Sequence, residues 1–472
     1  GLFTLAAGSG LRLLPDTAAA AAWWDRGIAY FGTNLSPALF GVGYIVGLNI
    51  GIVVLTGGII GWNIALPIYS SFFLEGNAAL ASAVAGASAE DAAYAIWSAQ
   101  IRYLGVGAML IGGVWTLISL RSSLLSGIRS GLATRRSEAA GTVVPHTERD
   151  IPMKLILIGL LLFTLPLLAL YQMIVGLWWV SIPMTIIMIV AGFLFVSVSA
   201  YMAGLVGSSN NPVSGITIAT VLFAALVLAL LLGRDAAIGP VAAIMIGAVV
   251  CCAACVGGDN LQDLKAGQLV GATPWKQQVM LAVGALSCAL VMAPVLNLLA
   301  QAYGIGVPSE AHPNPLLAPQ ATLMASVARG IFGGELPWTT IGVGAGIGAV
   351  IIIVDELLKR RGFSFRFPVL ACAIGIYLPL ELSVPIFAGG LLAHLVERSR
   401  GGAQSESSRG VLFAAGLITG EALLGILIAI PIVVTEKIDV LALPASLQFG
   451  EWLGLLLMAL VAWLLWRTAR HA

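Results

Sequence analysis

The chain has 472 residues, of which 59% are apolar and only 10% are charged, and its net charge is +1. Soluble domains carry about 25% charged residues, and a globule with a mean hydropathy of +1.00 would expose too much apolar surface to stay in solution. The composition therefore excludes a soluble enzyme, a disordered scaffold and a nucleic-acid binder. It predicts a protein that crosses a lipid bilayer many times.

Apolar runs long enough to cross a bilayer recur along the chain, and backbone groups in lipid must pair within helices. We therefore predict an all-α polytopic membrane helix bundle that forms one transmembrane domain over residues 1–472. The runs lie at 37–73, 103–120, 154–176, 178–206, 214–232, 237–257, 277–301, 337–357, 367–396, 410–432 and 448–466.

Two of these runs, 37–73 and 367–396, are too long for one crossing and are interrupted by Gly, Pro or polar residues. Arginine-rich segments mark the cytoplasmic side, which makes 121–153 a cytoplasmic loop. The other basic loops agree with that orientation only if 367–396 enters and leaves on one side. Pro379 and Pro385 would interrupt a helix there, so we expect broken or re-entrant helices.

Segments 42–62 and 374–394 align without gaps, and Asn49 falls on Glu381. The loop charges place the two copies in opposite orientations. We therefore expect 37–120 and 367–432 to be parts of an inverted repeat, although Gly-rich apolar sequence also matches itself by chance. Inverted repeats whose broken helices meet near the midplane are typical of transporters.

Few carboxylates lie at membrane depth, where each needs a reason. Glu421 lies near the middle of 410–432 and could carry a proton or contact substrate, or it could be a protonated group bonded between helices. Glu381, at the double-proline interruption, could take the same roles, with Asn49 as its pseudo-symmetric partner. Glu335 could line an external vestibule or begin a solvated helix.

Polar segments near the inner side provide further candidates. Asn210 and Asn211 could line the substrate or proton pathway, or they could simply form an Asn-Pro turn that leads a helix. Asp259 and Asp263 are four residues apart, which on a helix places both carboxylates on one face. They could bind Mg²⁺ for pyrophosphate chemistry, gate an ion or substrate pathway, or belong to a capped, solvated loop.

The cysteines and histidines suggest no metal site or cofactor. The five cysteines all fall inside apolar runs, where they are best explained as small packing residues. They are Cys251, Cys252, Cys255, Cys288 and Cys372.

One further motif is Gly258-Asp259-Asn260-Leu261-Gln262-Asp263-Leu264-Lys265-Ala266-Gly267 with the following 270–278. Other short motifs lie at 36–39, 41–47, 207–215, 318–325, 333–338, 377–380 and 420–423. Together, and in this order, these motifs resemble the oligopeptide transporter (OPT) family, in its bacterial branch. The plant branch of this family includes the yellow-stripe-like metal–chelate transporters.

The resemblance implies a proton-coupled symporter, not an enzyme, that moves small peptides or peptide-like metal chelates across the inner membrane. Its expected partners are the substrate, protons and the lipid bilayer. Family members carry apolar helices before the segment 36–39, so an N-terminally truncated chain is expected. The alternative is a Mg²⁺-dependent, prenyltransferase-like membrane enzyme that acts on a lipid pyrophosphate through Asp259 and Asp263.

Overall fold

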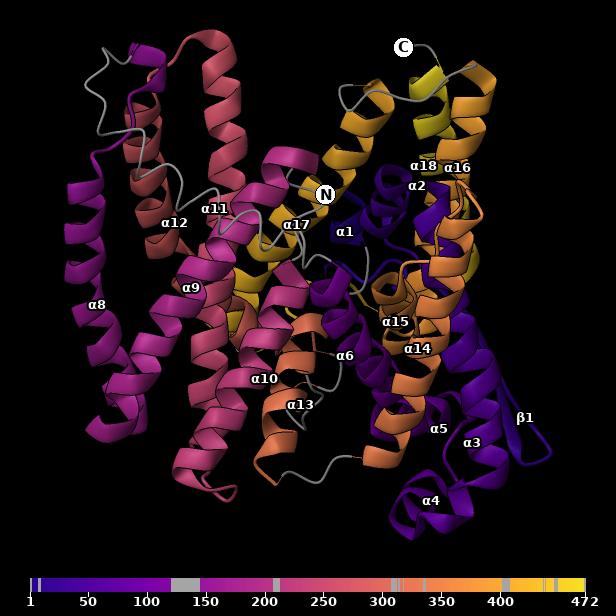
Figure 1. The fold of residues 1–472 in the computed structure, drawn as a ribbon. Coiled ribbons are helices and arrows are strands. Elements are labelled where there is room, and N and C mark those ends of the chain that lie inside the picture. The colour runs from indigo at the N-terminus through magenta and orange to yellow at the C-terminus, as the bar shows by residue number, and fades with distance from the viewer. Residues whose placement is uncertain are drawn as a thin grey trace. The chain divides into compact units, whose positions relative to one another are not determined.

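Helices make up nearly all of the structure, a computed structural model (Figure 1). It describes residues 2–6, 10–119, 145–206, 213–306, 312, 315–316, 318–333, 337–400, 408–435, 437, 439–444 and 449–470. Within these ranges, ten helical segments are long and apolar enough to cross a membrane. The predicted all-α polytopic bundle is therefore confirmed.

The chain divides into two compact units. The first comprises Gly1–Gly112, Val295–Pro319 and Pro337–Ala472, and the second comprises Gly113–Pro294 and Gln320–Leu336. The first unit contains α1 (Leu2–Ala6), β1 (Thr17–Trp24), β2 (Gly27–Asn34), α2 (Pro37–Gly58), η1 (Ile59–Ala65), α3 (Leu66–Phe72), η2 (Leu74–Gly76), α4 (Ala78–Val84), α5 (Ala89–Ile96), η3 (Trp97–Ile101), most of α6 (Arg102–Ser119), α14 (Trp338–Arg360), α15 (Val369–Tyr377), α16 (Leu380–Arg400), α17 (Arg409–Thr435) and α18 (Glu451–Arg470).

The second unit contains η5 (His146–Glu148), α8 (Met153–Val175), α9 (Trp178–Val206), α10 (Val213–Leu232), α11 (Gly239–Val270), most of α12 (Pro274–Tyr303) and most of α13 (Pro319–Ile331). Here α9 packs along α11, which also contacts α10. The predicted run 237–257 is too short, because α11 continues to Val270 and ends at Gly271, whose φ is 76°. The loop interpretation of 258–267 is therefore wrong: these residues are helical.

The all-α prediction misses a small antiparallel hairpin formed by β1 and β2. Its tight turn is made by Asp25, whose φ is 56°, and Arg26. Along β2, Ile28 and Tyr30 are buried whereas Phe31 is exposed. This alternation with period two is the pattern of a strand with one buried face.

Both long runs contain the predicted breaks. In α2 the helix is interrupted at Gly47, whose φ of 83° and ψ of 172° are not helical. The second run breaks between α15 and α16, where Leu378 is extended and precedes Pro379. The expectation that Pro385 also belongs to the break is wrong, because Pro385 lies inside α16.

The broken helices pack closely against each other through glycines, and α2 and α16 lie side by side (Figure 1). A Cβ on Gly375 would collide with the Val54 carbonyl oxygen, and one on Gly43 would collide with the Ile386 carbonyl oxygen. In the gapless alignment these two contacts are equivalent, since Gly43 aligns with Gly375 and Val54 with Ile386.

A second pair of contacts repeats the relation. A Cβ on Gly57 would meet the Cys372 carbonyl oxygen, and one on Gly389 would meet the Phe40 carbonyl oxygen. The two segments therefore run antiparallel, and each contact has an equivalent contact in which the two segments exchange roles. Such reciprocal packing is what an inverted pair produces; the wider limits 37–120 and 367–432 stay a prediction.

We expect Gly375→Ala to destabilise the protein by about 1–3 kcal/mol, because the new methyl group meets backbone, which cannot rotate away. Gly346→Ala on α14 is the matched control, since the space beside Gly346 is open. Alanine at that helical position should be neutral or stabilise by up to about 1 kcal/mol. Thermal unfolding of the detergent-solubilised protein checks both, and equal midpoints for the two variants would contradict the packing described above.

Candidate functional site

The carboxyl group of Glu381 lies in the first turn of α16, directly after the break, and is only 4% exposed. The Tyr30 hydroxyl donates to its Oε2 at 3.1 Å, and the Tyr94 hydroxyl donates to its Oε1. Both hydroxyl donors to this carboxylate come from residues that are distant from Glu381 in sequence.

These two tyrosines come from separate elements, Tyr30 from β2 and Tyr94 from α5. Their hydroxyl oxygens are 3.4 Å apart. Burial, and then the charge of Glu381, raise the pKa of Tyr30 and of Tyr94 well above that of an exposed tyrosine. Both phenols consequently remain protonated and serve as donors across the physiological range.

The two tyrosines that donate to this carboxylate belong to a group of packed aromatic rings. The ring of Trp62 lies 4.6 Å from that of Tyr30 and 5.3 Å from that of Tyr94, and Trp97 stacks on Trp62 at 5.7 Å, between centroids. Trp62 Nε1 donates to the Leu378 carbonyl oxygen at 3.2 Å, which satisfies a backbone group freed by the break. We call Tyr30, Trp62, Tyr94 and Trp97 the aromatic cluster.

Two π-helical turns supply the tryptophans of the aromatic cluster. Trp62 lies within η1 and Trp97 begins η3. A π-turn adds one residue to the helical repeat and is frequent at functional sites. Here the wider turns place both indoles on the side of the helices that faces Glu381's tyrosine partners.

Asn49, aligned with Glu381, lies just after the other break and makes a different contact. Its Nδ2 donates to the Arg366 carbonyl oxygen at 3.2 Å. Arg366 in turn forms a two-pronged ion pair with Asp355, at 2.8 and 2.6 Å. No described group lies within hydrogen-bond distance of the buried Asn49 Oδ1, so Asn49 has an acceptor to offer at the helix break.

Glu421 on α17 holds the beginning of α2. Its Oε1 accepts a hydrogen bond from the Ser36 hydroxyl at 2.7 Å, and its Oε2 accepts one from the Ala38 N–H at 3.0 Å. Ser36 also caps the helix by accepting from the Leu39 N–H at 3.2 Å. A carboxylate in this position is stabilised by the positive end of the helix dipole.

The structure does not place the remaining predicted site residues near Glu381. Asp259 and Asp263 belong to the second unit, where both side chains are exposed on α11. Gln277 of α12 donates to the Asp263 carbonyl oxygen at 3.0 Å, which joins the ends of these two helices. Glu335, Asn210 and Asn211 lie outside the described residues.

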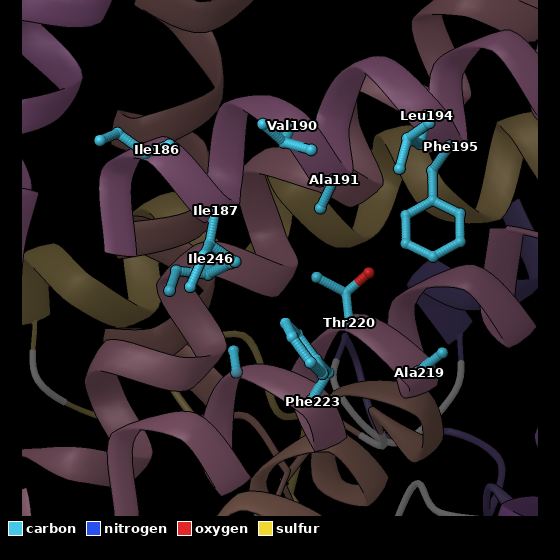
Figure 2. Close-up of a pocket in the computed structure, with 11 residues that line it drawn as sticks. Ile186, Ile187, Val190, Ala191, Leu194, Phe195, Ala219, Thr220, Phe223 and Ile246 are labelled. Carbon is cyan, nitrogen blue, oxygen red and sulfur yellow. The ribbon is translucent and has the colours of Figure 1, made fainter. Parts of the chain in front are cut away.

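The second unit contains a cavity of about 500 Å³ between α9, α10 and α11 (Figure 2). Ile187, Val190 and Phe223 are among its lining side chains. The one hydroxyl group of its lining belongs to Thr220 and donates to the Ile216 carbonyl oxygen at 2.8 Å. The described lining thus has no free polar group that could orient a peptide, and Glu381 is the better candidate.

The sequence prediction missed the aromatic cluster. The period-two pattern of Ile28, Tyr30 and Gly32 in β2 was a usable signal for an inward-facing tyrosine. No sequence pattern points to Tyr94, Trp62 or Trp97, because their proximity to Glu381 arises only when distant segments pack together.

We expect Tyr94→Phe to destabilise the protein by about 1–3 kcal/mol, since it removes a donor from a buried carboxylate. In a Glu381→Leu background the same change should be neutral or stabilising, because the Tyr94 hydroxyl then lacks its partner. Tyr69→Phe, on α3, is the matched control and should cost less than about 0.5 kcal/mol. Thermal unfolding midpoints of the single and double variants measure this double-mutant cycle. An equal cost of Tyr94→Phe in both backgrounds would rule out the coupling between Tyr94 and Glu381.

Comparison with known proteins agrees with this architecture. The family model described as OPT oligopeptide transporter protein matches residues 10–432. A protein of Haemophilus influenzae, provisionally named an oligopeptide transporter, is 36% identical over 95% of this chain and 75% of its own length. A Saccharomyces cerevisiae protein with the same provisional name is 25% identical over 46% of this chain and 29% of its own length. The chain is a multi-pass membrane protein that belongs to the oligopeptide transporter (OPT) family of transporters.

Proposed function

We propose that the protein is a proton-coupled symporter that carries oligopeptides, or peptide-like metal chelates, across the inner (plasma) membrane. The observation that carries this proposal is the buried carboxyl group of Glu381 at a helix break, beside a second broken helix that packs on it in antiparallel fashion. Substrate and ion sites of secondary transporters lie at such breaks. The relatives' names add the peptide substrate class.

Substrate contact belongs to the two residues that directly follow the breaks, Glu381 and Asn49. Glu381 provides a carboxylate, and Asn49 provides an acceptor, Oδ1, that no described group occupies. An acidic group and an amide at equivalent positions can contact different parts of a dipolar peptide.

The proton belongs to Glu421, which is only partly buried and holds the beginning of α2. An ionised carboxylate accepts strongly from the Ala38 N–H and is favoured by the helix dipole. A proton on Glu421 removes its charge and weakens this hold on α2. Proton binding thereby acts on one of the two broken helices that present the substrate residues.

Asp259 and Asp263 are proposed to gate the inner end of the pathway, with Glu335, Asn210 and Asn211 along its course.

The alternative function, a magnesium-dependent membrane enzyme, finds no support. Among the residues that the structure describes, no group of three or more His, Cys, Asp or Glu side chains is placed to hold a metal ion, and the comparisons favour a transporter.

Uptake of a labelled di- to tetrapeptide library, with and without a bound metal, into proteoliposomes under an imposed pH gradient tests the proposal. We expect accumulation that follows the gradient. Glu421→Gln should lower pH-driven accumulation about ten-fold, equivalent to about 1.4 kcal/mol, while exchange of substrate without a gradient continues. Glu381→Gln should lower accumulation and exchange together, since it alters the substrate site.

Glu356→Gln is the matched control, because Glu356 forms surface ion pairs with Lys359 and Arg360 on α14. It should leave uptake at the wild-type rate. Unchanged pH-driven uptake in both Glu421→Gln and Glu381→Gln would remove the coupling roles, and no uptake of any peptide or chelate by the wild-type protein would overturn the function itself.

A further inference from the structure

Glu381 is a buried acid, and its partners among the described residues are uncharged. Ion pairs such as those of Arg26 with Glu75 and of Asp355 with Arg366 do not include it. Buried charges in proteins are normally paired with an opposite charge. The two phenol groups are neutral donors, so they do not neutralise the negative charge of an ionised Glu381.

The surroundings of Glu381 suit a small organic cation. Neighbouring rings among Tyr30, Trp62, Tyr94 and Trp97 have centroids 4.6–6.0 Å apart. Ring faces attract an ammonium group by cation–π interaction, most strongly where water is excluded. The carboxylate of Glu381 offers a full negative charge, and the tyrosine rings that contact it, with the tryptophans packed on them, offer ring faces to the same cation.

The cluster also contains an unused donor. Trp97 is 5% exposed, and no acceptor among the described residues lies within hydrogen-bond distance of its Nε1. Buried N–H groups nearly always have a partner. A carbonyl oxygen that enters the cluster together with an ammonium group would fill this position.

In this structure the Tyr30 hydroxyl donates a hydrogen bond to Oε2 of the Glu381 carboxylate. Tyr30 belongs to a hairpin whose polar contacts include the bond from Asn63 Nδ2 to the Tyr30 carbonyl oxygen at 3.0 Å and the bond from the Ile28 N–H to Ser70 Oγ at 3.2 Å. The exposed pair of Arg26 and Glu75 lies at its tip. A ligand N–H group that reaches Glu381 would compete with the Tyr30 hydroxyl for Oε2.

We propose that Glu381 and the aromatic cluster bind the α-ammonium group of a peptide's first residue. In this site Trp97 Nε1 donates to the first carbonyl oxygen of the peptide. The Tyr30 hydroxyl takes the place of the ammonium group when no peptide is bound. The proposal rests on the proposed function, because it assigns a peptide end to the substrate site. It predicts that a free N-terminus is required and that a free C-terminus is not.

Three matched probes test this on the unmodified, full-length chain in detergent at one pH, so that no proton gradient is involved. They are tetra-alanine, N-acetyl-tetra-alanine and tetra-alanine amide, and calorimetry measures their binding. We expect the first and third to bind with similar affinity, and acetylation to weaken binding about ten-fold or more, the scale of a hydrogen bond to a charged group. Equal binding of all three, or a loss confined to the amide, overturns the proposal.

Variants separate recognition from folding. Tyr30→Phe removes the competing hydroxyl and should tighten tetra-alanine binding several-fold, an effect opposite to that of structural damage. Tyr69→Phe, outside the cluster, should leave affinity unchanged. Trp97→Phe keeps a ring, loses the N–H donor, and should weaken binding. Unchanged or weaker binding in a folded Tyr30→Phe protein overturns the competition.

The two proposals fail in different ways. Peptide binding that ignores acetylation, with intact pH-driven uptake, overturns only the ammonium site. Acetylation-sensitive binding without pH-driven uptake overturns only the coupled transport. Absence of binding by all three probes overturns the ammonium site and the peptide substrate together.

Discussion

The first unit depends on the close approach of two broken helices. Gly43 and Gly57 on α2, and Gly375 and Gly389 on the α15–α16 pair, each lie against a carbonyl oxygen of the opposite segment. In hydrocarbon, an interrupted helix survives only where protein or water covers its freed backbone groups. Each broken helix packs on the other here, and small residues are what allow the backbones to approach.

This arrangement also determines which polar groups reach the breaks. Asn49 and Glu381 occupy equivalent positions, and each is held by the segment that leads into the opposite helix: Glu381 by Tyr30 of β2, and Asn49 by the Arg366 carbonyl oxygen. The geometry is nearly symmetric, whereas the chemistry is not, because one side offers a carboxylate and the other an amide. A dipolar substrate would meet two different surroundings across a pseudo-symmetric centre.

The sequence alone was sufficient for features with a local cause. Hydropathy located the membrane helices, Pro379 marked a break, and the alignment paired Asn49 with Glu381. It failed where the cause is not local. The polyalanine strand of β1 has little intrinsic strand preference, and its pairing with β2 is favoured by the buried Tyr30. Similarly, α11 extends past its apolar part because nothing in 258–267 stops a helix before Gly271.

Glu421 and the helix that carries Glu381 both contact the half of α2 that precedes Gly47. Glu421 holds the N-terminus of α2, and Gly47 gives that helix a non-helical joint, so the half-helix between them is anchored at one end and hinged at the other. Phe40 lies on this half-helix and contacts Gly389 of α16. On the proton role proposed above, release of Glu421 would free the beginning of this half-helix. Any tilt about Gly47 would then change its contact with α16, the helix that carries Glu381. The two carboxylates would be coupled through helix packing.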